Sequence, residues 1–455
     1  MKASHAVKQT LLALLVCILA LPASAEWKEK VLYSFQGGTD GAYPAGGVVF
    51  DKQGNLYGAT QQGGGTNCSP MAACGTVYQL VPPAKKGDPW TENVLHVFQG
   101  KQHNDGEFPS GGVIADAVGN IYGTSSYGGT GDCVLLGIQG GCGTVFELSP
   151  PQTKGGKWTY TILYSFKGGK DGYLPFGDLV FDSAGNLYGA TYFGGGKGTT
   201  CNPYYQYCGT VFRMSPPKIK GGAWTEKVLH RFAGGADGAN PSGGLVLGNT
   251  GVVYGTTSTG GNSGCKTTYS VGCGTAFALK HSKKTRGAWT EMMLHRFTGG
   301  DDGGSPNGGL IFDAKGALYG TGGGGAHQAQ GVVFRLMSTS GGRWDDTTVY
   351  DFPSNEVCGA SPLAGVVFDA EGSLYGTASE GGAVGGGTIY RLRPLEENSW
   401  ACGVLYNFNG APDGSFPASV LIFDAAGNLY GTTRYSGSGQ ACGNYGCGTV
   451  FTGKP

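Results

Sequence analysis

Charged side chains are scarce in this chain, and they leave no net charge. They make up 14% of its 455 residues, against about 25% in an ordinary soluble domain. Lysine and arginine number 31 together, as do aspartate and glutamate, so the formal net charge at pH 7 is zero. A protein that binds nucleic acid usually neutralises phosphates with an excess of basic groups. The composition therefore argues against a nucleic-acid partner.

Long hydrophobic runs are lacking outside the N-terminus. There, two lysines precede an apolar run at 11–21 and a small-residue cleavage site at Ala23–Ala25. This order is typical of a secretory signal peptide, and the run is too short to cross a bilayer comfortably. We expect a signal peptide at 1–25, a single repeat domain at 26–455, and no transmembrane segment after cleavage. The protein would then be secreted, periplasmic or attached to the cell surface.

Recognisable catalytic motifs are lacking as well. The sequence has no G-x-S-x-G elbow, no H-E-x-x-H zinc motif and no phosphate-binding loop. Three of its seven histidines, His96, His230 and His295, stand in L-H-x-F segments. Other repeats have a tyrosine there, at Tyr33, Tyr164, Tyr350 and Tyr406. A position at which histidine and tyrosine alternate is interpreted as structural, so we predict no catalytic residue, no metal site and no cofactor.

Cysteine, in contrast, is plentiful, and its spacing indicates disulfides. Loss of Cys17 with the signal peptide leaves twelve of the thirteen cysteines, an even number that an oxidising compartment favours. Zinc is the alternative, but its paired cysteine ligands are usually about two to four residues apart, and no histidine accompanies these pairs. We predict six disulfides: Cys68–Cys74, Cys133–Cys142, Cys201–Cys208, Cys265–Cys273, Cys358–Cys402 and Cys442–Cys447.

Seven tryptophans and 89 glycines mark an internal repeat. Each tryptophan opens a unit that reads W-x-x-x-x-L-Y-x-F, G-G-x-D-G-x-x-P, G-x-V-F-D-x-x-G-N-L-Y-G-T-T and G-T-V-F-x-L. Four short runs rich in Val, Leu, Tyr and Phe, separated by Gly and Asp turns, predict four strands; in the first unit these are 27–35, 46–50, 55–60 and 75–80. Seven such units predict an all-β, seven-bladed propeller of antiparallel blades, with a linear solenoid as the alternative.

The phase of the repeat predicts how the ring closes. We name the strands of a blade A to D from the axis to the rim, with the tryptophan strand as D. The chain opens with a D strand and ends just after a C strand, so the last unit lacks its own D. The strand at 27–35 can supply it. One sheet would then join the two ends of the chain and leave no open edge.

The most faithful copies of the repeat include L-Y-S-F-Q-G-G-T-D-G-A-Y-P at 32–44, F-D-S-A-G-N-L-Y-G-A-T at 181–191 and C-G-T-V-F at 447–451. These segments resemble the Gloeo/Verruco (GloVer) tandem repeat of secreted bacterial proteins. The resemblance covers nearly the whole chain beyond the signal peptide. It implies an exported protein and supplies neither an activity nor catalytic residues.

The B–C loops are the first candidate for a binding surface. Five of them have 14–17 residues and hold a cysteine pair, whereas two have 8 residues and none. A long loop made rigid by a disulfide suits ligand binding, and protection from proteolysis is the alternative. The third loop contributes Tyr204, Tyr205 and Tyr207, which lie near Tyr192 and Phe193 and could stack on sugar rings. Packing on neighbouring blades is the alternative for these aromatic side chains.

Two classes of function are compatible with the sequence. We favour a monomeric, non-enzymatic binding or scaffold propeller for an unknown extracellular ligand, with carbohydrates or the cell envelope as candidates. The alternative is a propeller-fold lyase or glycan hydrolase. An enzyme would show a local carboxylate or histidine cluster in the central funnel, whereas aspartates recur in ring-like fashion. The D–A turns hold Asp40, Asp105, Asp171, Asp237, Asp302 and Asp413, which we assign to turns rather than to calcium.

Overall fold

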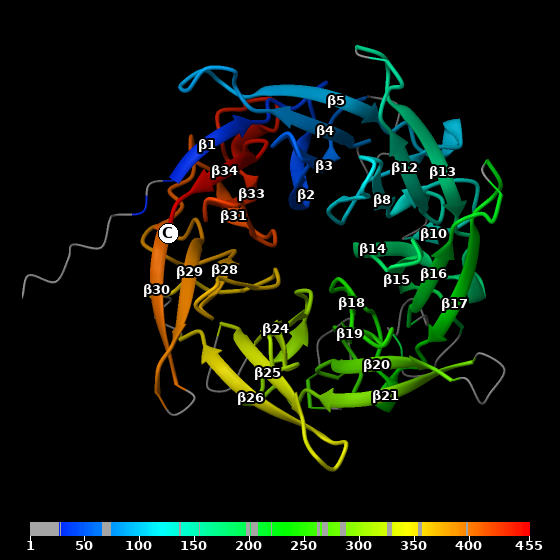
Figure 1. Cartoon of the computed structure of the whole chain (residues 1–455), viewed down its shortest axis with the longest axis vertical. Coiled ribbons are helices and arrows are strands. Elements are labelled where there is room, and N and C mark those ends of the chain that lie inside the picture. The colour runs from blue at the N-terminus through cyan, green and yellow to red at the C-terminus, as the bar shows by residue number, and fades with distance from the viewer. Residues whose placement is uncertain are drawn as a thin grey trace, which may run out of the picture.

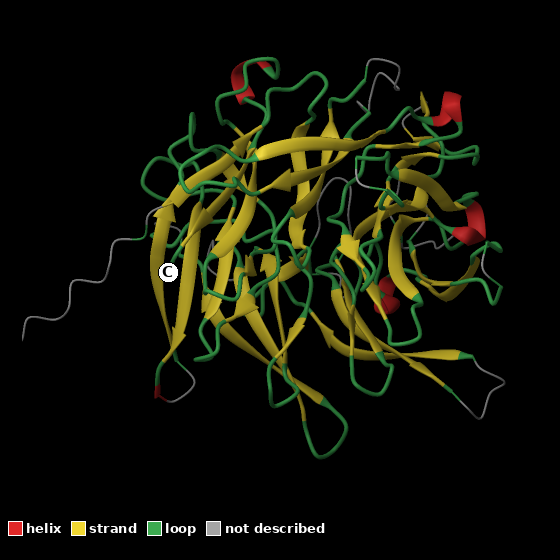
Figure 2. Ribbon diagram, turned by 45° about the horizontal axis from the view of Figure 1, so that its top comes forward, coloured by secondary structure: helices red, strands yellow, loops and turns green. Residues whose placement is uncertain are grey.

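The structure is a computed structural model. It describes residues 27, 29–65, 74–135, 138–153, 155–196, 201, 208–219, 221–261, 264–265, 272–282, 288–324, 330–353, 357–396 and 399–455. Seven antiparallel sheets surround a central axis, as blades of a propeller (Figure 1). The seven-bladed, all-β fold predicted from the repeat is therefore confirmed. Within the described residues, helix is confined to short turns in the loops between strands (Figure 2). None of the described helices is long and apolar enough to cross a membrane.

Each blade runs from strand A at the axis to strand D at the rim. Blade 1 consists of β2 (Ala42–Phe50), β3 (Leu56–Gln62), β4 (Thr76–Val81) and β5 (Thr91–Val97). Blades 2 to 4 are β7 (Ile114–Ala115), β8 (Ile121–Ser125), β12 (Thr144–Ser149) and β13 (Thr159–Ser165); β14 (Tyr173–Phe181), β15 (Leu187–Phe193), β16 (Thr210–Ser215) and β17 (Thr225–Arg231); and β18 (Val246–Leu247), β19 (Val253–Thr257), β20 (Thr275–His281) and β21 (Trp289–Arg296).

Blades 5 and 6 continue this order around the ring. They are β22 (Gly304–Pro306) with β23 (Ile311–Phe312), β24 (Leu318–Gly323), β25 (Val332–Ser338) and β26 (Trp344–Asp351); and β27 (Val367–Phe368), β28 (Leu374–Ala378), β29 (Thr388–Pro394) and β30 (Trp400–Asn407). Two short pairings were not predicted from the repeat. Strand β6 (Gly106–Glu107) pairs with β9 (Tyr127–Gly128) across the intervening β7 and β8, and β10 (Val134–Leu135) forms a hairpin with β11 (Ile138–Gln139).

Blade 7 contains both ends of the described chain. Its strands are β31 (Ser415–Pro417) with β32 (Ile422–Phe423), β33 (Leu429–Tyr435), β34 (Thr449–Gly453) and β1 (Glu29–Ser34). Strand β1 pairs antiparallel with β34, from Glu29 opposite Gly453 to Ser34 opposite Thr449. Figure 1 shows the blue β1 along the red β34. The predicted closure of the ring by the N-terminal strand is confirmed.

An aromatic pair repeats between consecutive blades. The phenylalanine that follows strand D of one blade packs edge-to-face on an aromatic ring of strand C of the next blade, as Phe166 after β13 does on Phe212 of β16 at 5.1 Å between ring centroids. Both rings are fully buried. Equivalent pairs join all seven pairs of neighbouring blades, with centroid distances of 4.9–5.3 Å. Such pairs add about 0.5–1.5 kcal/mol beyond the burial of area, so they help to hold each blade against its neighbour.

Neighbouring A strands contact each other through their backbones. A Cβ atom on Gly46 would collide with the backbone nitrogen of Gly112, and one on Gly243 would lie 2.6 Å from the carbonyl oxygen of Gly308. Gly46 also has a φ of +62°, which favours glycine. The glycines of the G-G-x-V segments thus allow the seven inner strands to approach closely around the axis. As a result, the axial space is narrow, and the few side chains in it stand out.

The seams between consecutive blades share a set of three positions, here called the seam trio. They are a Tyr or His on strand D, the residue of the following D–A turn, and the second residue after Trp on the next strand D. The trios are Tyr33, Asp40, Glu92; His96, Asp105, Tyr160; Tyr164, Asp171, Glu226; His230, Asp237, Glu291; His295, Asp302, Asp346; Tyr350, Cys358, Cys402; and Tyr406, Asp413, Glu29.

The aspartates of the seam trios organise the D–A turns, as the sequence predicted. Asp40 accepts hydrogen bonds from the backbone N–H of Gln36 (2.9 Å) and from the hydroxyl of Tyr33 (3.0 Å). The seam with cysteines confirms that the second and third positions are neighbours, because Cys358 and Cys402 form a disulfide there. A covalent bond in one seam thus replaces the carboxyl groups of the others.

Candidate ligand site at the propeller axis

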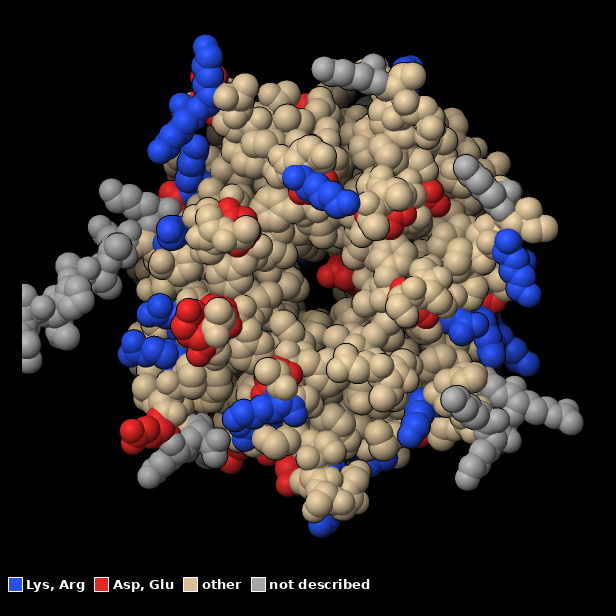
Figure 3. Space-filling model, viewed as in Figure 1, with Lys and Arg blue, Asp and Glu red and all other residues tan. Residues whose placement is uncertain are grey.

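The axis holds a cavity of about 460 Å³ that all seven blades line. Its walls are the first residues of the A strands and the last residues of the B strands, for example Ala45 and Gln61 of blade 1. The space-filling view shows the hollow at the centre of the disc, with acidic atoms at its edge and most basic side chains farther out (Figure 3). Its volume lies within the range of about 300–1,000 Å³ that is usual for small-molecule sites.

The cavity opens towards the face that carries the D–A turns and the B–C loops. These two sets of connections are hydrogen-bonded to each other; the N–H of Gly195, at the start of a B–C loop, donates to the carbonyl of Gly169 in a D–A turn (2.8 Å). The disulfides lie at the same level, since a Cβ on Gly168 would meet the Cys133 sulfur. The face predicted to bind ligand therefore does contain a cavity, at its centre.

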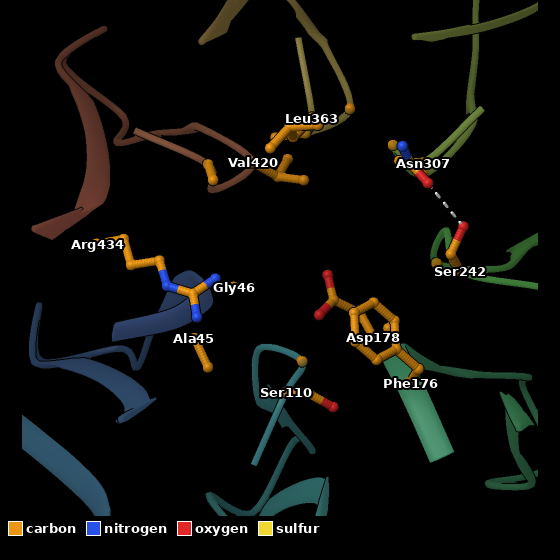
Figure 4. A pocket seen from close by; sticks show the side chains of 18 of the residues that line it. Ala45, Gly46, Ser110, Phe176, Asp178, Ser242, Asn307, Leu363, Val420 and Arg434 are labelled. Atoms are coloured by element: carbon orange, nitrogen blue, oxygen red, sulfur yellow. Dashed lines mark hydrogen bonds between the residues drawn. The ribbon is translucent and has the colours of Figure 1, made fainter. Parts of the chain in front are cut away.

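One wall position is occupied by a carboxylate in blade 3 and by small or apolar residues in the other blades. Asp178 projects into the cavity (Figure 4), and its Oδ1 accepts a hydrogen bond from the backbone N–H of Gly112 (2.5 Å). Burial raises the pKa of this carboxyl, and the N–H of Gly112 opposes that shift in part. The equivalent residues of the other blades are Gly47, Gly112, Gly244, Gly309, Gly365 and Val420.

A second wall position carries a guanidinium in blade 7. Arg434 reaches the cavity from the end of β33, on the side across from Asp178 (Figure 4). Its Nε is buried without a hydrogen-bond partner among the described residues, and its guanidinium carbon lies 5.5 Å from the centroid of the Tyr435 ring. The equivalent residues of the other blades are Gln61, Ser126, Tyr192, Ser258, Gly323 and Ser379.

Neutral polar and apolar side chains fill the rest of the wall. Ser110, Ser242 and Asn307 offer hydroxyl and amide groups, and Ser242 hydrogen-bonds Asn307 at 3.2 Å. Phe176 and Leu363 add apolar surface to the wall (Figure 4). The cavity therefore combines one negative group, one positive group, several hydrogen-bonding groups and an apolar wall. Such a lining can orient a small polar ligand that also has a nonpolar face.

The predicted aromatic site residues fall into three groups. Tyr192 lines the axial cavity, and its backbone carbonyl accepts a hydrogen bond from Asn240 Nδ2 (3.0 Å). Phe193 is buried in the core of blade 3, where its ring lies 5.4 Å from that of Tyr173. Tyr204, Tyr205 and Tyr207 lie outside the described residues. Of the predicted set, Tyr192 is therefore the residue that the structure brings to the cavity.

Five of the six predicted disulfides are present: Cys133–Cys142, Cys201–Cys208, Cys265–Cys273, Cys358–Cys402 and Cys442–Cys447. Cys74 is also disulfide-bonded, and its predicted partner Cys68 lies outside the described residues. This number of disulfides indicates an oxidising environment.

Asp178 and Arg434 were not predicted from the sequence. The ring-like recurrence of aspartates predicted no local charge in the funnel, but Asp178 is a departure from the repeat on one blade. The signal was available, because alignment of the units puts this aspartate in a column of glycines and one valine. What the alignment could not show is that this column faces the axis.

Comparison with known proteins agrees with the fold and leaves the chemistry open. No curated protein matches the chain. A fungal alcohol oxidase in complex with copper has 14% identity and a TM-score of 0.51, over 94% of this chain and 77% of its own. A protein of unknown function from Dyadobacter fermentans has 10% identity and a TM-score of 0.44, over 94% of this chain and 98% of its own. At 14% identity the similarity to the alcohol oxidase shows the fold alone.

The sequence itself identifies the family. The model of the Gloeobacter/Verrucomicrobia repeat matches residues 20–202 and 133–362, and these ranges together cover most of the chain. Each matched range covers several consecutive blades of the structure. The chain belongs to the Gloeobacter/Verrucomicrobia repeat family.

Proposed function

We propose that this protein is an exported, non-enzymatic binding propeller whose axial cavity holds a saccharide-type ligand. The observation that carries the proposal is the pair of charged side chains, Asp178 and Arg434, in a cavity that is otherwise neutral. The disulfides and the signal peptide predicted at the N-terminus support an exported location. The ring of seven blades serves as the rigid frame that keeps the two charges apart.

The chemistry of the wall suits a hydroxyl-rich ligand. A carboxylate such as that of Asp178 accepts hydrogen bonds from neighbouring hydroxyls, while a guanidinium donates to hydroxyl or carboxylate oxygens. Phe176 and Leu363 can cover the C–H face of a sugar ring. Because Asp178 and Arg434 lie on opposite sides of the cavity (Figure 4), a ligand between them would contact both.

The test starts with a glycan-array screen of the oxidised protein, followed by calorimetric titration of each hit. Two variants restore the repeat instead of disrupting it: Asp178→Gly introduces the residue of five other blades, and Arg434→Gln the residue of blade 1. Charge-assisted hydrogen bonds contribute about 1.5–3 kcal/mol, so we expect each variant to lose tenfold or more in affinity. Thermal unfolding of both should stay close to wild type.

A triple variant, Tyr204→Ala with Tyr205→Ala and Tyr207→Ala, compares the cavity with the third B–C loop. If the cavity is the site, this variant binds like wild type. A ligand that is lost in the triple variant and kept in Asp178→Gly would move the site to the loop and refute the proposal.

A lyase is the second candidate, and the same two residues favour it over a hydrolase. Glycoside hydrolases generally use two carboxyl groups, whereas Asp178 is the one carboxylate among the described residues of the cavity wall. A base and a neutralising cation, by contrast, are what proton abstraction next to a carboxylate requires. Incubation of each hit with catalytic amounts of the protein, followed by analysis of the products, distinguishes an enzyme from a binding protein. Turnover by wild type that disappears in Asp178→Asn would establish the enzyme.

A further inference from the structure

The seam between blades 3 and 4 brings three metal-ligating side chains together. His230 comes from β17, Asp237 from the turn that follows it, and Glu291 from β21 of the next blade. One ligand atom from each of these residues lies within 4.8 Å of the other two. The Nε2 of His230 is 3.3 Å from Oδ1 of Asp237. Ligand atoms about 2.1 Å from a tetrahedral zinc ion would be about 3.4 Å apart, so this distance already suits an ion.

Two of these ligand atoms make no hydrogen bond of good geometry, although both side chains lie against Asp237. The Nε2 of His230 and the Oε1 of Glu291 are buried and have no hydrogen-bond partner among the described residues. Asp237 is held in place independently, because its Oδ2 accepts the backbone N–H of Ala233 (2.6 Å). Buried polar atoms normally find a partner, and one that does not requires an explanation.

The other seams show that the unpartnered nitrogen is particular to this one. In the seams with tyrosine the hydroxyl satisfies the aspartate, as in Tyr164 to Asp171 (2.8 Å). A glutamate oxygen without a partner recurs there, for example Oε1 of Glu226. Among the described seams, that of His230 alone combines such a glutamate with a buried histidine nitrogen that makes no hydrogen bond.

The two other histidine seams are arranged differently. His96 hydrogen-bonds Asp105 (3.0 Å), and its ring stacks on Tyr160 at 3.7 Å, where a second carboxyl would have to be. His295 has a carboxylate at each ring nitrogen, with Asp302 2.9 Å from Nε2 and Asp346 3.6 Å from Nδ1. A single ion cannot use both nitrogens of one imidazole.

We propose that His230, Asp237 and Glu291 form a binding site for a divalent transition ion of the zinc class. One imidazole and two carboxylates are a common donor set for such ions, and solvent completes the coordination. The ion would cross-link strands D of blades 3 and 4 at the rim. Arg296 is a nearby cation, but its Nε donates to the carbonyl of Ala236 (3.0 Å), which fixes the guanidinium on the same turn.

The test is a calorimetric titration of ZnCl₂ into the oxidised, untagged, metal-stripped protein, with CaCl₂ as a second probe. His230→Tyr is the central variant, because tyrosine stands at this position in four other seams and should fold normally. Glu291→Gln removes the second carboxylate at constant shape. His96→Tyr makes the same exchange in a seam without the ligand set.

We expect one tight zinc site in wild type and in His96→Tyr, and a loss of at least tenfold in affinity in His230→Tyr and in Glu291→Gln. Calcium should bind weakly, because it prefers oxygen ligands. Anomalous diffraction at the zinc edge should place the ion among the three side chains. No zinc binding by wild type, or an affinity unchanged in a folded His230→Tyr protein, would overturn the proposal.

Discussion

A glycine of each B strand lies directly beneath an aromatic ring of strand C. In blade 2, a Cβ atom on Gly123 would be 2.6 Å from the ring of Phe146, which is fully buried. The Y-G dipeptide of the repeat is therefore required by packing, because any larger residue would displace the ring that packs between this blade and its neighbour.

Gly123→Ala should lower the free energy of unfolding by about 1–3 kcal/mol, the usual cost of overpacking a core. Gly403→Ala is the matched control, since no atom lies within 4 Å of a Cβ built there. It should be neutral or slightly stabilising. Chemical denaturation of both variants measures the difference. Equal stability of the two would contradict the packing account.

Two seam glutamates, Glu29 of β1 and Glu92 of β5, have pKa values far above the ordinary range. Burial, with Asp413 nearby, raises the pKa of Glu29 from 4.5 to about 8. Burial, with Asp40 nearby, raises the pKa of Glu92 from 4.5 to about 7. Tyr406 faces the first of these carboxyls, and Tyr33 and Tyr78 face the second.

Because the pKa values of both glutamates are raised in the folded protein, their contribution to its stability decreases as the pH rises. A folded-state pKa above the unfolded one means that the native protein binds the proton more tightly. The contribution to stability is then complete below pH 4.5 and disappears as the pH rises through about 7 to 8. We expect the double variant Glu29→Gln and Glu92→Gln to lose less stability than wild type between pH 5 and pH 8.5. If the melting temperatures of the two proteins changed equally with pH over this range, the raised pKa values of Glu29 and Glu92 would be refuted.

At the scale of single elements, the disulfides close loops of very different length. Cys358–Cys402 spans 44 residues and links two blades, whereas Cys442–Cys447 spans 5 residues within one loop. In the chain-entropy model a disulfide stabilises more when it closes a longer loop. The seam disulfide should therefore contribute more than any of those in the B–C loops.

Replacement of Cys358 and Cys402 by alanine should cost about 4 kcal/mol, and the same exchange at Cys442 and Cys447 about 2 kcal/mol. Denaturant unfolding of the two double variants provides the comparison. A larger loss from the short loop would show that packing around the disulfide, rather than loop closure, determines its contribution.

The elements themselves were largely predictable, because each unit repeats the same turn and strand signals. The Asp51 turn illustrates this, since its Oδ1 accepts the N–H groups of Gln53 and Asn55 (2.9 Å each), as its position before the turn predicted. The hairpin of β10 and β11 was not predictable, because it lies in a variable loop that has no counterpart in other units. The seam trios were missed for another reason: their members are far apart in sequence, and the contact appears only when blades are placed side by side.

At the scale of the whole molecule, β1 joins the two ends of the ring. Leu32 of β1 is nearly buried and Phe35, directly after β1, is fully buried; both pack in the core between blades 7 and 1. Without β1, the edge of β34 would be unpaired and this core open to solvent.

Deletion of residues 27–35 should therefore cost more than the 3–5 kcal/mol of a single buried phenylalanine. Deletion of Lys454 and Pro455, which are exposed beyond β34, is the control and should be silent. Differential scanning calorimetry of the two deletion variants and wild type measures these losses of stability. A protein without β1 that melts with wild type would exclude closure through blade 7.

The axial site is the central claim of this account, and its position could not be derived from the sequence because the inward register of strand A was unknown there. The most direct measurement is a crystal structure of the oxidised protein with a saccharide from the glycan screen. We predict ligand density in the axial cavity, in contact with the Asp178 carboxylate and the Arg434 guanidinium. Density on the B–C loops with the cavity free of ligand would contradict the account.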